Sequence, residues 1–276
     1  KMKNIYDETI KDFGDEWNLY QYSENDKENK KIFDQYFDIF PWDQDNLSEF
    51  DCLDIGCGTG RWSKILSSKV KSINLLDPSD KALNIAKKNL KGVTNVKFTN
   101  EKFDDVNLKN ESFDFIFSLG VLHHMKNIDK QIIKINRLLR EGGLTLIYLY
   151  YRFDNKSIAF KLIWKLSDII RKFICRLPFK LKSLVCSFIA TTIYLPLSYL
   201  YKFLNLFKIN TRKFPLSFYT DKSFYIMKTD ALDRFGTKVE NRFLKKEIEN
   251  LLLDSGFKDI KFSVNEPFWH VIAKKK

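Results

Sequence analysis

The chain has 276 residues, of which 44% are hydrophobic and 30% are charged, and its net charge is +12. This length allows one or two domains with a substantial core, and the composition is typical of a soluble intracellular protein. Four cysteines without a Cys-x-x-Cys pair, three histidines and a polar N-terminus indicate a reducing cytoplasmic compartment, no metal site and no secretory signal.

Residues 1–50 are predicted to form an N-terminal helical cap. Large apolar residues recur there at three- and four-residue steps, as on the core-facing side of a helix: Phe33, Tyr36, Phe37 and Phe40. Trp17 and Tyr20 allow two interpretations that the residues leave open. They either pack the first helix onto the core or line a substrate site.

A glycine-rich run follows this cap. Asp54, Gly56, Gly58 and Gly60 give the spacing D-x-G-x-G-x-G, between an apolar stretch and a helix-like segment at 61–66. Glycine lets the backbone approach a ligand closely, and the helix that follows directs unpaired N–H groups at the turn. The spacing differs from the pyrophosphate turn G-x-G-x-x-G and from the phosphate loop. We therefore expect a small ligand at the end of a strand.

The next predicted strand, residues 70–76, ends at Asp77. A carboxylate about twenty residues beyond such glycines is where α/β folds bind both hydroxyls of a ribose. Together, the turn and Asp77 predict a nucleoside ligand that has no pyrophosphate.

These residues resemble the first two motifs of the class I S-adenosylmethionine-dependent methyltransferases, in the small-molecule branch called type 11. Residues 112–124 are similar to the family's fourth strand and the loop after it, and residues 137–144 to its helix end and Gly-Gly turn. The resemblance implies a Rossmann-like, seven-stranded α/β fold with its cofactor-binding core at 51–151. It implies S-adenosyl-L-methionine as cofactor and S-adenosyl-L-homocysteine as product.

The cofactor-binding residues that the resemblance implies lie at the ends of four strands: Asp54, Gly56, Cys57, Gly58, Gly60, Asp77, Pro78, Glu101, Phe103, Ser118 and Leu119. The adenine position departs from the family pattern of an acidic residue followed by a small one. We expect Glu101 to supply a carboxylate there and Phe103 a backbone N–H and an apolar wall.

A hydroxyl acceptor would need a general base, and histidine suits this role near neutral pH. His124, at the end of the loop after the fourth strand, is the first candidate and His123 the second. The alternative is that these histidines orient the loop or pack beneath the insert that follows.

Residues 152–240 are predicted to be an inserted helical lid. Between residues 151 and 213 the charge balance is +11, almost the whole net charge of the chain. Residues 157–174 read as a helix with a broad apolar face and an opposite stripe at Lys161, Lys165, Asp168 and Lys172. Residues 183–201 carry no charge and have the length of a transmembrane segment. A single span would separate the two parts of the core, so we do not expect a simple anchor.

Three interpretations of the insert stay open. It packs on itself and on the core, it lies through residues 157–213 on anionic lipid at the inner membrane face, or it binds nucleic acid. Nucleic acid is disfavoured because large aliphatic residues interrupt the basic ones and no Asn-Pro-Pro-Tyr-like motif is present. A protein partner, such as a second copy, is a further option, and the oligomeric state is open.

The chain then returns to the sheet. Four polar residues along this return are candidates for substrate contacts, or for an ion pair and turn caps within the lid: Tyr219, Asp230, Asp233 and Arg234. Residues 241–276 are predicted to form a C-terminal helix and an antiparallel edge hairpin, with Trp269 and His270 packed inside.

The function that we predict is methyl transfer to an oxygen or nitrogen of a small-molecule, sugar or lipid-linked acceptor. One alternative is a lipid-surface or partner-binding module that retains the cofactor pocket with little transfer activity. Another is a nucleic-acid methyltransferase.

Overall fold

The computed structural model describes residues 5–21, 26–43, 46–211 and 214–276. The chain forms two compact units. The first combines residues 1–152 with residues 239–276, and the second is Phe153–Lys238, inside the stretch predicted as the insert.

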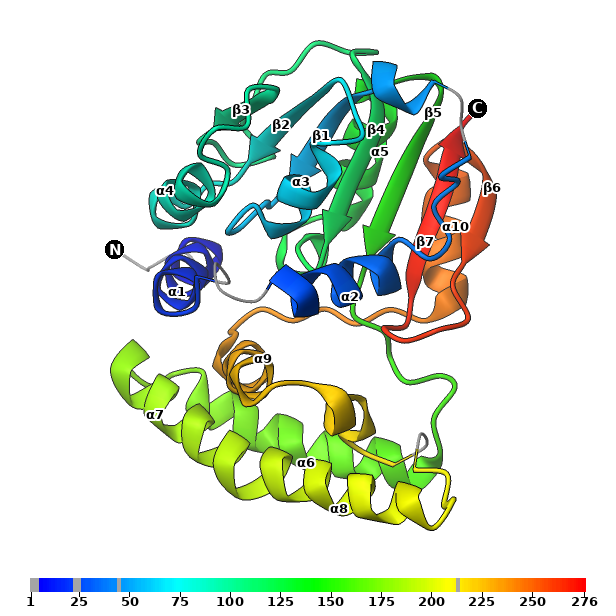
Figure 1. The fold of residues 1–276 in the computed structure, drawn as a ribbon. Coiled ribbons are helices and arrows are strands. Elements are labelled where there is room, and N and C mark those ends of the chain that lie inside the picture. The colour runs from blue at the N-terminus through cyan, green and yellow to red at the C-terminus, as the bar shows by residue number, and fades with distance from the viewer. Residues whose placement is uncertain (1–4, 22–25, 44–45, 212–213) are drawn as a thin grey trace. The chain divides into compact units, whose positions relative to one another are not determined.

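The first unit is built on a sheet whose strand order is β3-β2-β1-β4-β5-β7-β6 (Figure 1). Within the described residues it has seven strands, so the predicted methyltransferase sheet is confirmed. The first five strands are parallel and the last two form the antiparallel edge hairpin. Their bounds are β1 (Asp51–Ile55), β2 (Ser72–Leu76), β3 (Val96–Thr99), β4 (Phe113–Leu119), β5 (Leu139–Tyr148), β6 (Phe257–Phe262) and β7 (His270–Lys275).

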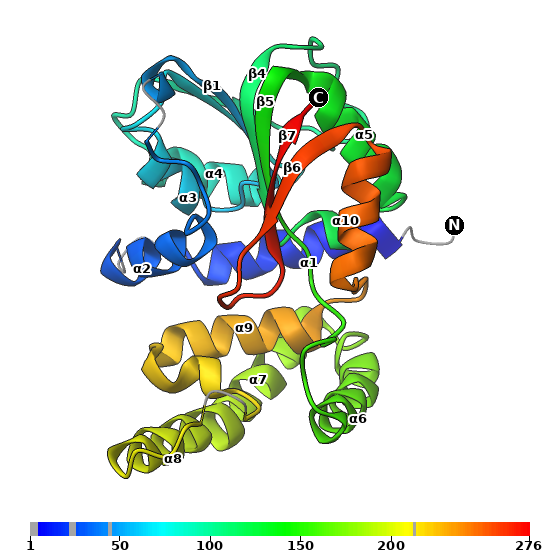
Figure 2. The same cartoon turned by 90° about the vertical axis from the view of Figure 1, so that its right-hand side faces the viewer.

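Helices cover both faces of this sheet (Figure 2). α3 (Arg61–Leu66) and α4 (Asp80–Asn89) lie on one face, and α5 (Ile128–Leu138) and α10 (Lys245–Asp254) on the other. Parallel strands that are buried on both faces read as continuous apolar runs, and β2 and β4 do so. The core cluster includes residues of the strands β1, β4 and β5 and of the helices α5 and α10: Leu53, Ile55, Ile116, Ile132, Ile135, Ile147 and Leu252.

Two N-terminal helices, α1 (Ile5–Leu19) and α2 (Asp26–Tyr36), lie across the carboxyl ends of the parallel strands (Figure 1). Phe33, Phe37 and Phe40 are 1%, 1% and 4% exposed, which confirms the predicted apolar face. Phe37 and Phe40 contact the ring of Phe115 in β4. The cap is therefore anchored through aromatic packing beside the place where the strands end.

The edge hairpin is tied to the cap by a buried histidine. His270 is fully buried, and its Nε2 lies 2.7 Å from Oδ1 of Asp38. Ser263 and Asn265 donate to the other oxygen of the same carboxylate. Burial alone raises the pKa of Asp38, but these three side chains hold that pKa below its ordinary value. Trp269 and His270 pack, as predicted.

The second unit is helical. Its helices are α6 (Ile158–Ile174), α7 (Phe179–Ile189), α8 (Leu195–Leu206) and α9 (Phe224–Gly236), and a π-helical turn at Ala190–Tyr194 joins α7 to α8. α9 packs against both α6 and α7. In the described part of the chain one helix, Phe179–Leu206, is long and apolar enough to cross a membrane, with 22% of its most apolar window buried.

The predicted polar stripe of α6 is wrong at one position. Asp168 does not share the exposed side of Lys161 and Lys165, because it turns inward to pair with Arg171 and Arg234. The ion pairs offset the cost of burying the carboxylate, so a charged residue occupies the inner face of the helix.

Candidate functional site

The glycine turn between β1 and α3 requires glycine at each of its three alternating positions. Gly56, Gly58 and Gly60 have φ angles of +73°, +54° and +71°, which L side chains rarely adopt. A Cβ on Gly56 would lie 2.5 Å from the methyl groups of Val121, and one on Gly60 would lie 2.7 Å from Leu90. The turn is therefore a tight cradle that presents backbone rather than side chains.

Asp77 stands at the carboxyl end of β2, beside this cradle. Its Oδ2 accepts the backbone N–H of Gly58 and its Oδ1 accepts that of Ser79, both at 2.9 Å. Burial raises the pKa of this carboxyl group to about 6. Each carboxylate oxygen retains capacity for a second hydrogen bond, so the group can accept the two hydroxyls of a ribose. Pro78, which follows Asp77 and precedes α4, is half-buried.

A second buried carboxylate lies under the turn. Asp54, in β1, accepts a hydrogen bond of 2.6 Å from the hydroxyl of Ser63 in α3. Burial, opposed by this bond and reinforced by the charge of Asp77, raises its pKa to about 7. Cys57 is buried next to it, and burial raises the pKa of its thiol well above the ordinary value. Cys57 is therefore a packing residue of the cradle and not a reactive thiol.

Helix α1 covers the site with two aromatic residues one turn apart. Two indole atoms of Trp17 lie 3.3 Å from the position that a Cβ on Gly58 would occupy. The ring of Phe13 lies 4.9 Å from that of His124. Tyr20 is 6% exposed and buried just beyond the helix. Trp17 thus lies at the cradle, while its role toward a substrate stays a prediction.

The loop after β4 brings both histidines to the same end of the sheet. Ser118 donates to the carbonyl of Ile55 at 3.1 Å, which links the end of β4 to the end of β1, and Leu119 is half-buried. His123 is fully buried, and its ring stacks on Tyr150 at 3.8 Å. Among the described residues, neither ring nitrogen of His123 has a hydrogen-bond partner. Burial lowers its pKa well below the ordinary value, so the ring is neutral.

His124 is held in a defined tautomer. Its Nδ1 lies 2.5 Å from the carbonyl oxygen of Val239, which follows the second unit in the chain. A carbonyl oxygen can only accept, so Nδ1 carries a proton, and whenever the ring is neutral its lone pair lies on Nε2. This tautomer suits a proton acceptor at Nε2.

Sequence reasoning missed several residues around this loop. Asn241 donates its backbone N–H at 3.1 Å and its side-chain amide at 3.0 Å to the carbonyl of His123. Tyr150 contacts both histidine rings, and Val121 fills the space against Gly56. Asn241 lies more than a hundred residues from the loop, so no local pattern could indicate its contact.

The two residues that we expect near the adenine, Glu101 and Phe103, have different surroundings. Glu101 is exposed. Phe103 is 2% exposed and its side chain belongs to the core cluster, so its contact with adenine stays a prediction. Asn100, which the sequence did not single out, donates to the carbonyl of Asp77 at 3.1 Å.

The four candidate substrate residues of the return segment lie in the second unit and make contacts inside it. Arg234 lies 3.8 Å from Asp168 and 3.1 Å from the hydroxyl of Ser167. Tyr219 hydrogen-bonds to Asp230. These contacts agree with the alternative that Arg234 and Asp230 hold the second unit together. Asp233 accepts from Thr237, four residues on, at the end of α9.

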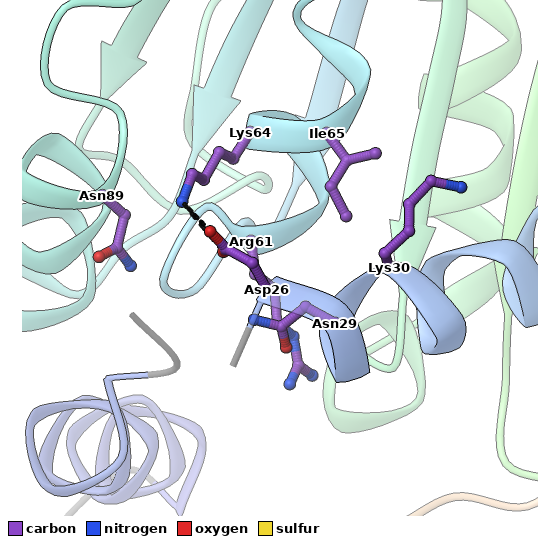
Figure 3. A pocket seen from close by; sticks show the side chains of 7 residues that line it. All are labelled: Asp26, Asn29, Lys30, Arg61, Lys64, Ile65 and Asn89. Atoms are coloured by element: carbon purple, nitrogen blue, oxygen red, sulfur yellow. Dashed lines mark hydrogen bonds and ion pairs between the residues drawn. The ribbon is translucent and has the colours of Figure 1, made fainter. Parts of the chain in front are cut away.

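A polar pocket of about 250 Å³ opens between α2 and α3 (Figure 3). Lys64 and Asp26 form an ion pair of 3.1 Å on its wall. Asn89 connects it to the glycine turn by donating to the carbonyl of Thr59 at 3.0 Å. The residues that line it are Asp26, Asn29, Lys30, Arg61, Lys64, Ile65 and Asn89, so none of the predicted site residues faces this pocket.

Residues 53–147 match the family described as a methyltransferase domain. A ubiquinone biosynthesis O-methyltransferase of Agrobacterium fabrum is 32% identical over 94 residues, which are 33% of this chain and 37% of that protein. An uncharacterized methyltransferase of Anoxybacillus flavithermus is 31% identical over 121 residues, covering 43% and 55%. The chain thus spans about a third to a half of the length of these curated relatives.

Solved structures show the same fold. An S-adenosylmethionine-dependent methyltransferase of Mesorhizobium loti superposes with a TM-score of 0.53 at 16% identity, over 87% of this chain and 95% of that one. Another from Thermotoga maritima gives 0.52 at 14% identity, over 96% and 99%. The D-x-G-x-G-x-G cradle, Asp77 and the sheet order agree with these matches, so residues 53–147 form a domain similar to the methyltransferase domain family.

Proposed function

We propose that this protein transfers a methyl group from S-adenosylmethionine to an oxygen or nitrogen of a small-molecule, sugar or lipid-linked acceptor. The observation that carries the proposal is the carboxylate of Asp77, held 2.9 Å from the backbone N–H of Gly58. This carboxylate would accept the hydroxyls of a ribose beside a cradle in which added Cβ atoms would clash.

The residues present fit the cofactor. Asp77 would hold the ribose hydroxyls, the backbone of Gly56 and Gly58 would cradle the methionine part, and Asp54 would add negative charge beneath a cationic ligand. When bound, S-adenosylmethionine supplies an activated methyl group on a sulfonium. Trp17, which lies against Gly58, would exclude water from the sulfonium. It would also direct the face of its indole ring toward the positive charge of that group.

We propose that the methyl acceptor binds at the loop after β4, which carries His123 and His124. With Nδ1 donating to the carbonyl of Val239, His124 would take a proton from a hydroxyl or ammonium acceptor through Nε2, which is buried and which the acceptor would have to reach. Phe13 and Tyr150 contact its ring and hold its orientation. The enzyme's main contribution would be to position the acceptor in line with the methyl group.

The test is incubation of the full chain with methyl-labelled S-adenosylmethionine and a cell extract, followed by separation of organic and aqueous phases. We expect label in a small product, absent with Asp77→Ala. Label in the organic phase identifies a lipid-linked acceptor, and label in water identifies a polar one. Label only in RNA or DNA, or no transfer at all, would overturn the proposal.

A further inference from the structure

The second unit carries extensive apolar surface on its outside. On α6, Ile158, Leu162 and Leu166 recur at four-residue steps and are 77%, 58% and 64% exposed. A helix in water normally turns such a stripe toward a core. Exposed apolar residues continue along α6, α7 and α8: Phe173, Leu184, Phe188, Ile193, Tyr199, Phe203 and Leu206. Apolar surface on this scale marks an interaction site.

Two basic residues are buried in the same unit, beside the apolar residues of its core. Arg171 is 8% exposed, donates to Asp168 at 2.7 Å and to the carbonyl of Thr237 at 2.8 Å. Lys182 is 1% exposed, and its aliphatic stem packs so closely on α9 that a Cβ on Gly236 would lie 2.9 Å from its Cδ. Charged residues are rarely buried in a small helical unit, and here they accompany an extensive apolar surface on its outside.

α7, the π-helical turn and α8 form one continuous helix, Phe179–Leu206, which we call the α7–α8 rod. Hydroxyl groups on its outside form hydrogen bonds within the helix. Thr191 donates to the carbonyl of Ser187 at 2.9 Å, and Thr192 donates to that of Phe188 at 2.8 Å. Side chains surrounded by hydrocarbon make such bonds because no water is present to accept them. The two polar residues therefore do not oppose burial of this surface in lipid.

The net charge of the second unit indicates what kind of surface its apolar side binds. Its balance of +11 over residues 151–213 leaves about +1 for the rest of the chain. Exposed basic residues are spread among the apolar ones: Lys161, Lys165, Lys172, Arg176, Lys180, Lys202 and Lys208. Their long stems let the charged ends reach headgroups while the apolar side chains are immersed, and anionic lipids attract them. We propose that α6 and the α7–α8 rod dock into one leaflet of an anionic lipid bilayer.

The topology favours docking over crossing. β5 precedes the second unit and β7 follows it, yet the two strands pair directly, with Leu146 opposite Ile272. Both ends of the unit must therefore lie on the same side of a membrane. In α6, Lys161, Lys165 and Lys172 are distributed along the helix, and charges at a bilayer centre are costly. An interfacial position satisfies both constraints.

The experiment is flotation of the full chain with phosphatidylcholine vesicles, with and without phosphatidylglycerol. We expect the protein to float with the anionic vesicles and much less with the neutral ones. Leu162→Ser combined with Leu166→Ser and Phe173→Ser should weaken flotation at least tenfold. The matched control, Ile133→Ser with Val264→Ser, removes residues that are 47% and 83% exposed in the first unit and should leave flotation unchanged.

A second variant separates charge from apolar insertion. Lys161→Gln with Lys165→Gln should reduce binding to anionic vesicles without changing the weak binding to neutral ones. Flotation that the apolar triple variant leaves intact would overturn the proposal. So would a stable dimer, seen by light scattering without lipid, that the same triple variant dissociates and that does not float. Because vesicle binding needs no turnover, its outcome is independent of the proposed methyl transfer.

Discussion

The indole ring of Trp17 lies against Gly58, with its Cε2 and Nε1 atoms 3.3 Å from the position that a Cβ at residue 58 would occupy. A residue of the N-terminal cap thus forms one wall of the cradle made by the β1–α3 turn. The cap and the cradle are therefore in contact, although about forty residues separate them in the chain.

The first prediction concerns this contact. Gly58→Ala should weaken S-adenosylhomocysteine binding at least tenfold, because it strains a φ of +54° and presses on the indole. In a Trp17→Ala background the indole ring is absent, so Gly58→Ala should weaken S-adenosylhomocysteine binding less. A double-mutant cycle by calorimetry should give a coupling of about 1 kcal/mol. Additive effects would show that the two residues act independently.

The second prediction concerns pH. Burial raises the pKa values of Asp54 and Asp77 to about 7 and about 6. The proposed binding mode uses both carboxylates in the ionised form. Affinity for S-adenosylmethionine should therefore rise as the pH increases from 5 to 8 and then level off. Asp54→Asn should flatten the upper part of this profile, whereas Asp80→Asn, on the exposed start of α4, should not change it. An equally steep profile in Asp54→Asn would contradict this.

The third prediction concerns the stability of the ligand-free protein. A carboxyl group whose folded pKa is raised contributes stability that is present at low pH and lost as the pH rises through that pKa. At pH 8, Asp54→Asn should therefore raise the melting temperature by roughly 2–6 °C, since the amide still accepts from Ser63. The gain should shrink as the pH falls from 8 to 5. A melting temperature that falls at pH 8 would contradict the proposed cost of ionising this site.

The fourth prediction separates the two histidines. His124→Ala should reduce turnover at least tenfold and leave cofactor binding unchanged, as for loss of a general base. His123→Phe should raise the free energy of unfolding by about 1 kcal/mol, because it removes two buried nitrogens without partners and keeps the stack on Tyr150. Chemical denaturation and single-turnover assays measure the two effects. A smaller loss in His124→Ala would remove its assignment as a base.

The cradle and the sheet could be predicted because each depends on local sequence. The three alternating glycines need a positive φ, and Asp77 follows directly from the end of an apolar strand. Contacts between distant segments could not be predicted in this way. The amide of Asn241 reaches the loop carbonyl of His123, and the backbone carbonyl of Val239 selects the tautomer of His124.

The second unit shows a different limit of prediction. Periodicity does not identify the buried side of α6, because residues of the predicted apolar face such as Leu162 and Leu166 are 58% and 64% exposed. Asp168 reads as part of a solvated stripe, but Arg171 and Arg234 neutralise it inside the unit. The neighbouring apolar residues are then left outside. The position of Phe103 in the core cluster depends in the same way on contacts between distant segments, which no local pattern indicates.

Equilibrium titration of the full chain with S-adenosylhomocysteine, and separately with NAD, tests the central claim most directly. The account predicts saturable one-to-one binding of S-adenosylhomocysteine, weakened at least tenfold by Asp77→Ala, and no binding of NAD. Binding of NAD in competition with S-adenosylhomocysteine, or S-adenosylhomocysteine affinity that Asp77→Ala leaves intact, would contradict it.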